Sequence, residues 1–313
     1  MIDLIREAAD FLKGRIRRTP VEYSPGLSDS LGVPVWLKLE SLQLTGSFKI
    51  RGALFAISKL RRDVITCSAG NHGKAVAYAA REASVRAVIC VPRSVDRAKL
   101  EGMQKLGADV RISAFDGYDD TQDWALEMAS REGLPFLSPF DDDFVMAANG
   151  GTLAMEVLED ASDARAFVLP VGGGGLAAGF AVWAKHALND SKIIGCQHEL
   201  SPALRLSLVA GRAITRLPAA ETFAGGVEGG IGARTFAVLQ PLVDRVALVS
   251  EGEIIFAVRW MVEHHQYLIE PTAAVTVAAC LSGKIGRLSA PAAVMVCGRN
   301  VSSETVRKIL CAS

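Results

Sequence analysis

Short apolar runs of strand length alternate with helical patterns through nearly the whole 313-residue chain. Such runs are typical of strands in a parallel sheet, because helices bury both faces of that sheet. The alternation therefore predicts an α/β fold. There are too many runs for one comfortable sheet, so we expect two sheets in two lobes that share a tight interface, with the ligand site in a cleft between them. The predicted strands are residues 35–39, 64–67, 87–91, 110–112, 166–171, 193–197, 246–249 and 293–297.

The balance of charge excludes several classes of function. Lys and Arg number 34, as do Asp and Glu, so no net basic field would attract nucleic acid or an anionic membrane. No apolar run approaches the length of a membrane span, and the charged N-terminal residues lack the form of a signal peptide. The six cysteines have no metal-ligand spacing. We therefore expect reduced core cysteines in a cytoplasmic protein.

A lysine lies just after the first predicted strand. Gly46 permits a turn and Ser47 can act as an N-cap, which places Lys49 in the first turn of a helix. The positive end of the helix dipole disfavours an ammonium there and predicts a lowered pKa for Lys49. A lysine that is neutral part of the time can attack an aldehyde and form an imine. An exposed lysine at a helix start would show the same pattern.

A second loop, residues 66–74, joins a predicted strand to a helix expected to begin near Ala75. Its small residues let backbone N–H groups approach a ligand, and a helix start favours an anion such as a substrate carboxylate. A tight turn capped by Asn71 or His72 would explain the same residues.

Four consecutive glycines, residues 172–175, lie between a predicted strand and a predicted helix. They are costly in chain entropy, and their unhindered N–H groups at a helix start favour a phosphate-binding role. The spacing of Gly172, Gly174 and Ala177, with Glu199 after the next strand, also fits a dinucleotide fingerprint. A nicotinamide-dependent oxidoreductase is thus an alternative, but this alternative gives no function to the loops around Lys49 and Asn71.

The three loops together resemble the fold-type II pyridoxal-phosphate enzymes, and most closely the threonine/serine dehydratase and serine racemase family, from residue 18 to residue 300. The resemblance implies a two-lobed fold similar to the tryptophan synthase β chain, each lobe an open, mainly parallel sheet flanked by helices. It implies a large cofactor-binding domain of residues 1–62 and 143–313, and a small mobile domain of residues 63–142. It also implies a homo-oligomer, either dimer or tetramer, with a small amino-acid substrate.

The resemblance assigns roles to the loop residues. Lys49 is implied to be the Schiff-base lysine of pyridoxal 5'-phosphate, with Phe48 packed against the pyridine ring. Asn71 is implied to meet the ring hydroxyl. The remaining implied sites are a phosphate cradle of Gly172, Gly173, Gly174 and Gly175, and a substrate-carboxylate loop of Ser68, Ala69, Gly70, Asn71 and His72.

Cys297 occupies the position where the family usually has a serine near the ring nitrogen. A thiol is a weak donor, so we expect the ring nitrogen to stay unprotonated. Such a cofactor is a weaker electron sink, suited to eliminating a β-substituent. A buried strand cysteine without any role is the alternative.

Departures from the family pattern favour one reaction. Racemases usually carry a serine at the position of Ala69, which has no proton to give. Gln197 and Ala203 align with the metal ligands of metal-dependent members, so we expect no divalent metal site, although Glu199 and Glu221 lie near in sequence. The chain ends soon after the catalytic unit, so we do not expect feedback by isoleucine through a regulatory domain.

The predicted reaction is α,β-elimination, which converts a β-hydroxy amino acid to a 2-oxo acid and ammonia, with Lys49 taking the α-proton. A racemase using the same cofactor and a non-catalytic binding protein are the alternatives. The substrate side chain stays undetermined, because segments 140–143 and 149–152 differ from the common family pattern. Gly225 also stands where the family usually has an Asp. Candidates are threonine, serine, 3-hydroxyaspartate, a phenylserine and a hydroxyectoine-derived amino acid.

Overall fold

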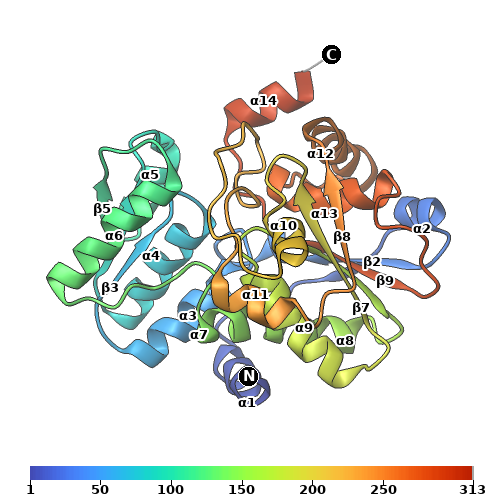
Figure 1. The fold of residues 1–313 in the computed structure, drawn as a ribbon, viewed down its shortest axis with the longest axis horizontal. Coiled ribbons are helices and arrows are strands. Elements are labelled where there is room, and N and C mark those ends of the chain that lie inside the picture. Colours follow the sequence, from blue (N-terminus) through green and yellow to red (C-terminus); the bar gives the residue numbers. More distant parts are fainter. Residues whose placement is uncertain (312–313) are drawn as a thin grey trace.

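The computed structural model describes residues 1–311, and it contains two sheets flanked by helices (Figure 1). The larger sheet has six strands in the order β1-β2-β9-β6-β7-β8, all parallel except β1 at one edge. The mainly parallel α/β architecture is therefore confirmed. The strands are β1 (Val21–Tyr23), β2 (Val35–Leu39), β6 (Ala166–Pro170), β7 (Lys192–His198), β8 (Arg245–Val249) and β9 (Ala292–Val296).

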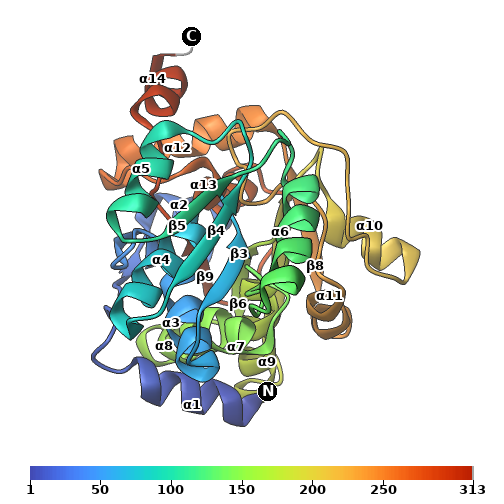
Figure 2. The same ribbon diagram turned by 90° about the vertical axis from the view of Figure 1, so that its left-hand side faces the viewer.

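A separate parallel sheet has the order β3-β4-β5 and lies to one side of the larger sheet (Figures 1 and 2). Its strands and covering helices all fall within residues 63–142, and the exact domain bounds and the mobility of this part stay predictions. The elements are β3 (Val64–Cys67), β4 (Ala87–Val91), β5 (Asp109–Ile112), α4 (Asn71–Ala83), α5 (Arg97–Lys105) and α6 (Tyr118–Glu132).

Eight of the nine strands within residues 1–311 coincide with predicted runs to within one residue at either end. These runs were readable because nearly every residue of β3, β4, β6 and β9 is buried, as a strand covered by helices requires. The missed strand, β1, has only three residues, none of them fully buried, and pairs with β2 in antiparallel register. An edge strand this short leaves no run of apolar residues to detect.

Helices cover both sheets, and local residues explain several of their ends. Ser250 and Glu253 form a capping box at the start of α12, and Gly133 ends α6 in the left-handed conformation. The remaining helices are α1 (Ile2–Leu12), α2 (Pro25–Leu31), α3 (Lys49–Leu60), α7 (Asp143–Met146), α8 (Thr152–Asp160), α9 (Gly175–Ala187), α10 (Ala203–Ala210), α11 (Ala233–Leu239), α12 (Glu251–His265), α13 (Pro271–Leu281) and α14 (Ser303–Cys311).

Residues 149–151 of the predicted substrate loop 149–152 instead lie in a buried π-helical turn, Ala147–Gly151, between α7 and α8. A Cβ atom on Gly150 would collide with the backbone of α9, so glycine permits this close approach. Asn149 Oδ1 accepts a hydrogen bond of 2.7 Å from Gly52 N in α3. The segment therefore fixes α3 and α9 relative to each other.

A buried ion network anchors α3 two residues beyond Lys49. The Arg51 guanidinium donates to both carboxylate oxygens of Glu40 at 2.9 and 2.8 Å. It also donates to Glu156 at 2.7 and 2.8 Å, and Lys38 Nζ lies 2.7 Å from Glu156 Oε2. Arg51 and Glu40 are both fully buried. Paired and fully hydrogen-bonded charges of this kind hold α3 against β2 and α8.

Removing the Arg51 charge is expected to destabilise the protein strongly. Arg51→Met leaves Glu40 as an uncompensated buried carboxylate, which should lower the free energy of unfolding by about 3–5 kcal/mol in chemical denaturation. Arg97→Met is the control, because its ion pair with Glu101 is exposed and should contribute less than about 0.5 kcal/mol. Equal effects of the two substitutions would contradict the prediction.

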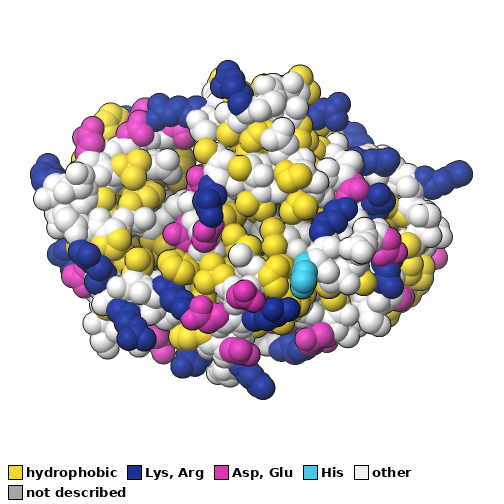
Figure 3. Space-filling model, turned by 60° about the horizontal axis from the view of Figure 1, so that its bottom comes forward, with side chains coloured by type: hydrophobic (Ala, Val, Ile, Leu, Met, Phe, Trp, Pro, Cys, Tyr) yellow, Lys and Arg dark blue, Asp and Glu magenta, His cyan; other side chains and the backbone are white. Residues whose placement is uncertain are grey.

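No helix within residues 1–311 has the length and apolar character needed to cross a membrane. On the face drawn in Figure 3, Lys and Arg side chains lie among Asp and Glu side chains, and hydrophobic side chains form a band across the middle. This mixture of signs agrees with the zero net charge of the sequence.

Candidate active site

Lys49 is the first residue of α3, where two distant segments meet. Ser47 bridges to Gly298, and Phe48 N donates to Cys297 O at 3.2 Å, so the end of β9 determines where the helix begins. The prediction that Ser47 is an N-cap is wrong, because Phe48 holds the cap position and Ser47 Oγ has no partner among residues 1–311. The antiparallel bridge to Gly298 keeps the Ser47 backbone outside the helix, which begins at Lys49.

The Lys49 ammonium lies in a poorly solvated position. Its Nζ donates to Pro139 O at 2.7 Å and lies 5.2 Å from the centre of the Phe48 ring. Burial lowers the pKa of Lys49 to about 8, against the opposing pull of Cys297 and Glu270. The direction is as predicted, but burial rather than the helix dipole is the leading cause.

This lowered pKa predicts how the cofactor-free protein captures pyridoxal phosphate. Only a neutral amine attacks an aldehyde, so the rate of capture should rise with pH and level off above the Lys49 pKa of about 8. Stopped-flow absorbance at a series of pH values would measure it. A rate that keeps rising towards the ordinary lysine pKa of 10.5 would show that Lys49 is solvated.

The second loop leads into α4, which begins at Asn71 rather than near Ala75. Gly70 occupies the cap position, and its N–H donates to Ser68 Oγ at 3.2 Å. The helix thus starts four residues earlier than predicted, so Asn71 and His72 belong to its first turn. Backbone N–H groups of a first helical turn lack intrahelical acceptors and can bind a carboxylate.

His72 lies buried in this first turn and is held neutral. Burial lowers its pKa to about 3, and the nearby Lys49 charge acts in the same direction. A neutral imidazole here adds no positive charge beside Lys49. The backbone of the turn, rather than a charged His72, therefore remains the candidate for holding a carboxylate.

Asn71 is engaged by residues that the sequence did not connect with it. Its Nδ2 donates to Glu270 Oε1 at 2.7 Å, and its Oδ1 accepts from Asn300 Nδ2 at 2.6 Å. Burial raises the pKa of Glu270 to about 7. Sequence reasoning missed Glu270 because an acid before Pro271 at a helix start is explained as a cap, and nothing local places it beside Lys49.

The glycine loop, residues 172–175, lies so close to the neighbouring backbone that larger residues would not fit at several of its positions. A Cβ on Gly172 would collide with Gly226 O, and one on Gly175 would lie 2.7 Å from Phe140 O. Gly174 has a φ of 93°, which other residues rarely adopt. Gly173 O accepts from Thr235 Oγ1 at 2.7 Å and from Gly232 N at 3.2 Å. With the start of α9 beyond it, the bare loop fits a phosphate group.

The other predicted site residues are placed as follows. Cys297 is buried at the end of β9, and burial raises the pKa of its thiol, so it stays protonated and can be only a weak donor. Gln197 Nε2 donates to Val171 O, and Gln197 Oε1 accepts from Arg205 N, so this side chain joins the end of β7 to α10 and to the segment after β6. Around Gly225 there is open space, so an aspartate side chain would fit there.

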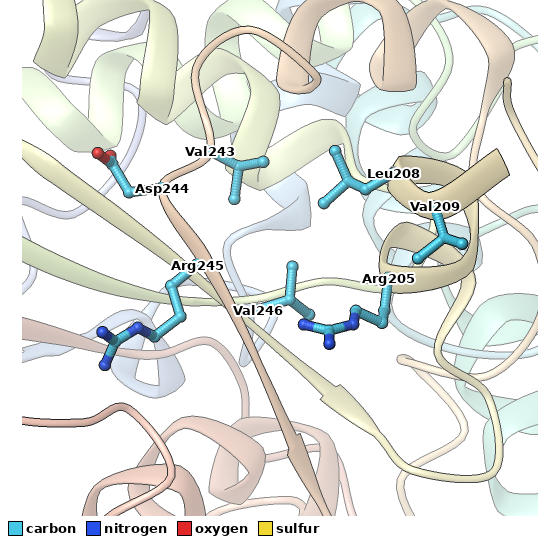
Figure 4. Close-up of a pocket in the computed structure, with 7 residues that line it drawn as sticks. All are labelled: Arg205, Leu208, Val209, Val243, Asp244, Arg245 and Val246. Carbon is cyan, nitrogen blue, oxygen red and sulfur yellow. The ribbon is translucent and has the colours of Figure 1, made fainter. Parts of the chain in front are cut away.

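A pocket of about 250 Å³ lies away from these residues (Figure 4). Arg205, Leu208 and Val209 of α10 line it together with Val243, Asp244, Arg245 and Val246 around the start of β8. None of the predicted site residues contributes to this surface pocket.

Comparison with known proteins decides which cofactor the site holds. The family model described as "Pyridoxal-phosphate dependent enzyme" matches residues 12–298. The chain belongs to this family. Its cofactor is therefore pyridoxal 5'-phosphate, and the nicotinamide-dependent alternative is excluded. Lys49, the first turn of α4 and the glycine loop are the candidates for the amine, the amide and the phosphate cradle that this cofactor needs.

Relatives and a solved structure refine the comparison. An L-threonine ammonia-lyase from Geobacter sulfurreducens is 36% identical over 313 residues, covering 98% of this chain and 77% of that protein. A putative threonine dehydratase from Sinorhizobium fredii is 36% identical over 317 residues, covering 99% and 95%. The structure of maize serine racemase matches with a TM-score of 0.92 at 29% identity, covering 99% of this chain and 96% of that one. The resemblance to the dehydratase and racemase family is confirmed.

Proposed function

We propose that this protein is a pyridoxal-phosphate-dependent ammonia-lyase that converts a β-hydroxy amino acid, with threonine and serine as first candidates, to a 2-oxo acid and ammonia. The observation that carries the proposal is Lys49, whose amine donates to Pro139 O at 2.7 Å and has its pKa lowered by burial to about 8. The names of the relatives as threonine ammonia-lyase and threonine dehydratase support the substrate class.

When bound, the cofactor supplies a sink for the electrons left at Cα after proton removal. Lys49 holds the cofactor, and once its amine is free it takes the α-proton as general base. A pKa of about 8 suits this task, because about a tenth of the amine is neutral at pH 7, far more than for a lysine with the ordinary pKa of 10.5. Backbone N–H groups of Ser68 to His72 orient the substrate carboxylate, and the glycine loop fixes the phosphate end.

Ala69 favours elimination over racemisation. Racemisation needs a second proton carrier on the face opposite Lys49, and an alanine methyl group has no proton to transfer. The structural likeness to a serine racemase bears on the fold more than on the reaction, since the sequence relatives carry dehydratase and ammonia-lyase names. The racemase therefore stays the second candidate.

A hydroxyl introduced at position 69 is expected to add slow racemisation. Ala69→Ser should yield D-amino acid from an L-substrate at a rate roughly 100-fold or more above that of the parent protein, since a positioned acid–base group contributes about that factor to proton transfer. Chiral chromatography of the remaining substrate measures it, with Ala69→Val as the control that adds bulk without a proton. Complete absence of the D-product would remove Ala69 as the discriminating residue.

A panel of β-hydroxy amino acids tests the proposal directly. Threonine, serine, 3-hydroxyaspartate and a phenylserine are incubated with the protein carrying pyridoxal phosphate, and 2-oxo acid and ammonia are measured together. Equal amounts of both products from at least one substrate are expected. If the opposite enantiomer accumulates without oxo acid, the racemase replaces the lyase as the proposed function.

A further inference from the structure

Four side chains form a continuous chain of hydrogen bonds beside Lys49. Lys74 Nζ donates to Asn300 Oδ1 at 3.0 Å. Asn300 Nδ2 then donates to Asn71 Oδ1 at 2.6 Å, and Asn71 Nδ2 donates to Glu270 Oε1 at 2.7 Å. The chain therefore begins at an ammonium, passes through two amides and ends at a carboxylate, with every bond donated in the same direction.

The two ends determine how both amides point. A lysine ammonium can only donate, and above the Glu270 pKa of about 7 the Glu270 carboxylate can only accept. In that range neither Asn300 nor Asn71 can exchange its oxygen and nitrogen without facing a like group. Asn300 Nδ2 also donates to Thr45 O at 2.9 Å, which uses its second hydrogen. Asn71 Nδ2 retains one hydrogen beyond the one it gives to Glu270.

We propose that Lys74 and Glu270 are positioning residues, which lock the amide of Asn71 so that its remaining N–H is directed to the ring hydroxyl of the cofactor. They also place one positive and one negative charge at the two ends of the hydrogen-bond chain. The inference rests on the proposed function, in which Lys49 holds pyridoxal phosphate and Asn71 meets that hydroxyl. It adds two residues, outside the three predicted loop roles, that set the charge around the Lys49 nitrogen.

The titratable and charged groups around the hydrogen-bond chain from Lys74 to Glu270 belong to several elements. Glu270 is influenced by Lys49 in α3 and Lys99 in α5, and the Asn300 backbone N–H also donates to it. Arg299 and Glu270 act on Lys74, and Cys297, Glu270 and His72 act at Lys49. Lys99 is exposed, so solvent should screen its charge, whereas Lys74 is half-buried and Glu270 is buried.

The charges at the two ends should move the titration of the cofactor-bound Lys49 nitrogen in opposite directions. Loss of the Lys74 cation favours the protonated, positively charged form of that nitrogen and raises its midpoint. Loss of the Glu270 anion removes a stabilising partner and lowers it. We expect shifts of roughly half a pH unit or more for Lys74→Met, Lys74→Gln and Glu270→Gln, as for partly buried charges close to a titrating group.

Cofactor affinity distinguishes the effect of the hydrogen bond that Lys74 donates from the effect of its charge. Lys74→Gln keeps a hydrogen-bond donor to Asn300 and should bind pyridoxal phosphate like the parent protein. Lys74→Met removes the donor and leaves Asn300 Oδ1 without the partner that holds it from that side, which should weaken binding by roughly five- to tenfold. The donor thus governs affinity, and the charge governs the midpoint.

The experiment follows the visible absorption band of the purified protein with pyridoxal phosphate against pH, and measures cofactor binding to the cofactor-free protein by fluorescence. Lys99→Met is the matched control, because it removes one nearby positive charge without breaking the hydrogen-bond chain. Opposite midpoint shifts for the Lys74 and Glu270 variants, with little shift for Lys99→Met, are the expected result. Equal shifts for Lys74→Met and Lys99→Met, or unmoved midpoints, would overturn the inference.

The same data separate this inference from the proposed function. A parent protein without a visible band, or a band that persists in Lys49→Ala, would remove the proposed role of Lys49 and the inference with it. A band lost in Lys49→Ala but unmoved in the Lys74 and Glu270 variants would remove only the inference. Should Lys74→Met unfold, Lys74→Gln and Glu270→Gln still test the sign of the shifts.

Discussion

Replacing Lys49 with alanine is expected to abolish both the visible band of the bound cofactor and the release of 2-oxo acid, with a loss of activity of roughly 1,000-fold or more. The effect is large because one side chain performs two tasks, holding the cofactor and removing the α-proton. Ala69 offers no second base that could replace it. Absorption spectra of the purified protein and a coupled oxo-acid assay would measure the two losses.

Two further variants show whether chemistry or charge is responsible. Lys49→Arg keeps a positive group that can donate to Pro139 O, but a guanidinium cannot form an imine, so this variant should be as inactive as Lys49→Ala. Lys59→Ala, farther along α3, removes an ion pair with Glu7 and a contact with the Phe55 ring, and it should keep both band and activity. A Lys49→Ala protein that retained a tenth of the parent rate would assign the base to another residue.

Substitution within the glycine loop is expected to weaken cofactor binding severely. A Cβ atom in Gly172→Ala would collide with the backbone oxygen of Gly226, which cannot move without displacing the segment that adjoins the loop. The loop must shift, and its N–H groups then lose their alignment with the phosphate. Because several charge-assisted hydrogen bonds are affected together, we expect the dissociation constant to rise by roughly 100-fold.

Gly225→Ala is the matched control for this substitution. It lies next to Gly226, but nothing surrounds its Cβ position within 4 Å, so binding should stay close to that of the parent protein. Fluorescence titration of both cofactor-free variants, with thermal melts to verify folding, gives the comparison. If Gly172→Ala bound pyridoxal phosphate as tightly as Gly225→Ala, the phosphate cradle would have to lie elsewhere.

The buried strands and the three loops were readable from the sequence because their signals are local. Every residue of strands such as β3 and β4 is buried, so these strands appear in the sequence as short, mostly apolar runs. The glycines of residues 172–175 and the small residues around Asn71 show where backbone must approach a ligand. The order of these loops along the chain was enough to identify the family and the cofactor.

Features that depend on contacts between distant residues were decided only by the tertiary structure. Ser47 looked like a cap, but its bridge to Gly298 moves the start of α3 to Lys49. The low pKa of Lys49 comes chiefly from burial, which no local pattern reports.

Glu270 and Lys74 looked like ordinary helix residues, and folding joins them through Asn71 and Asn300. The sequence by itself determined the elements, the family and the residue types of the site. Only the fold decided which charges surround Lys49, because electrostatic interactions depend on distance in space and on exclusion of water, not on separation along the chain.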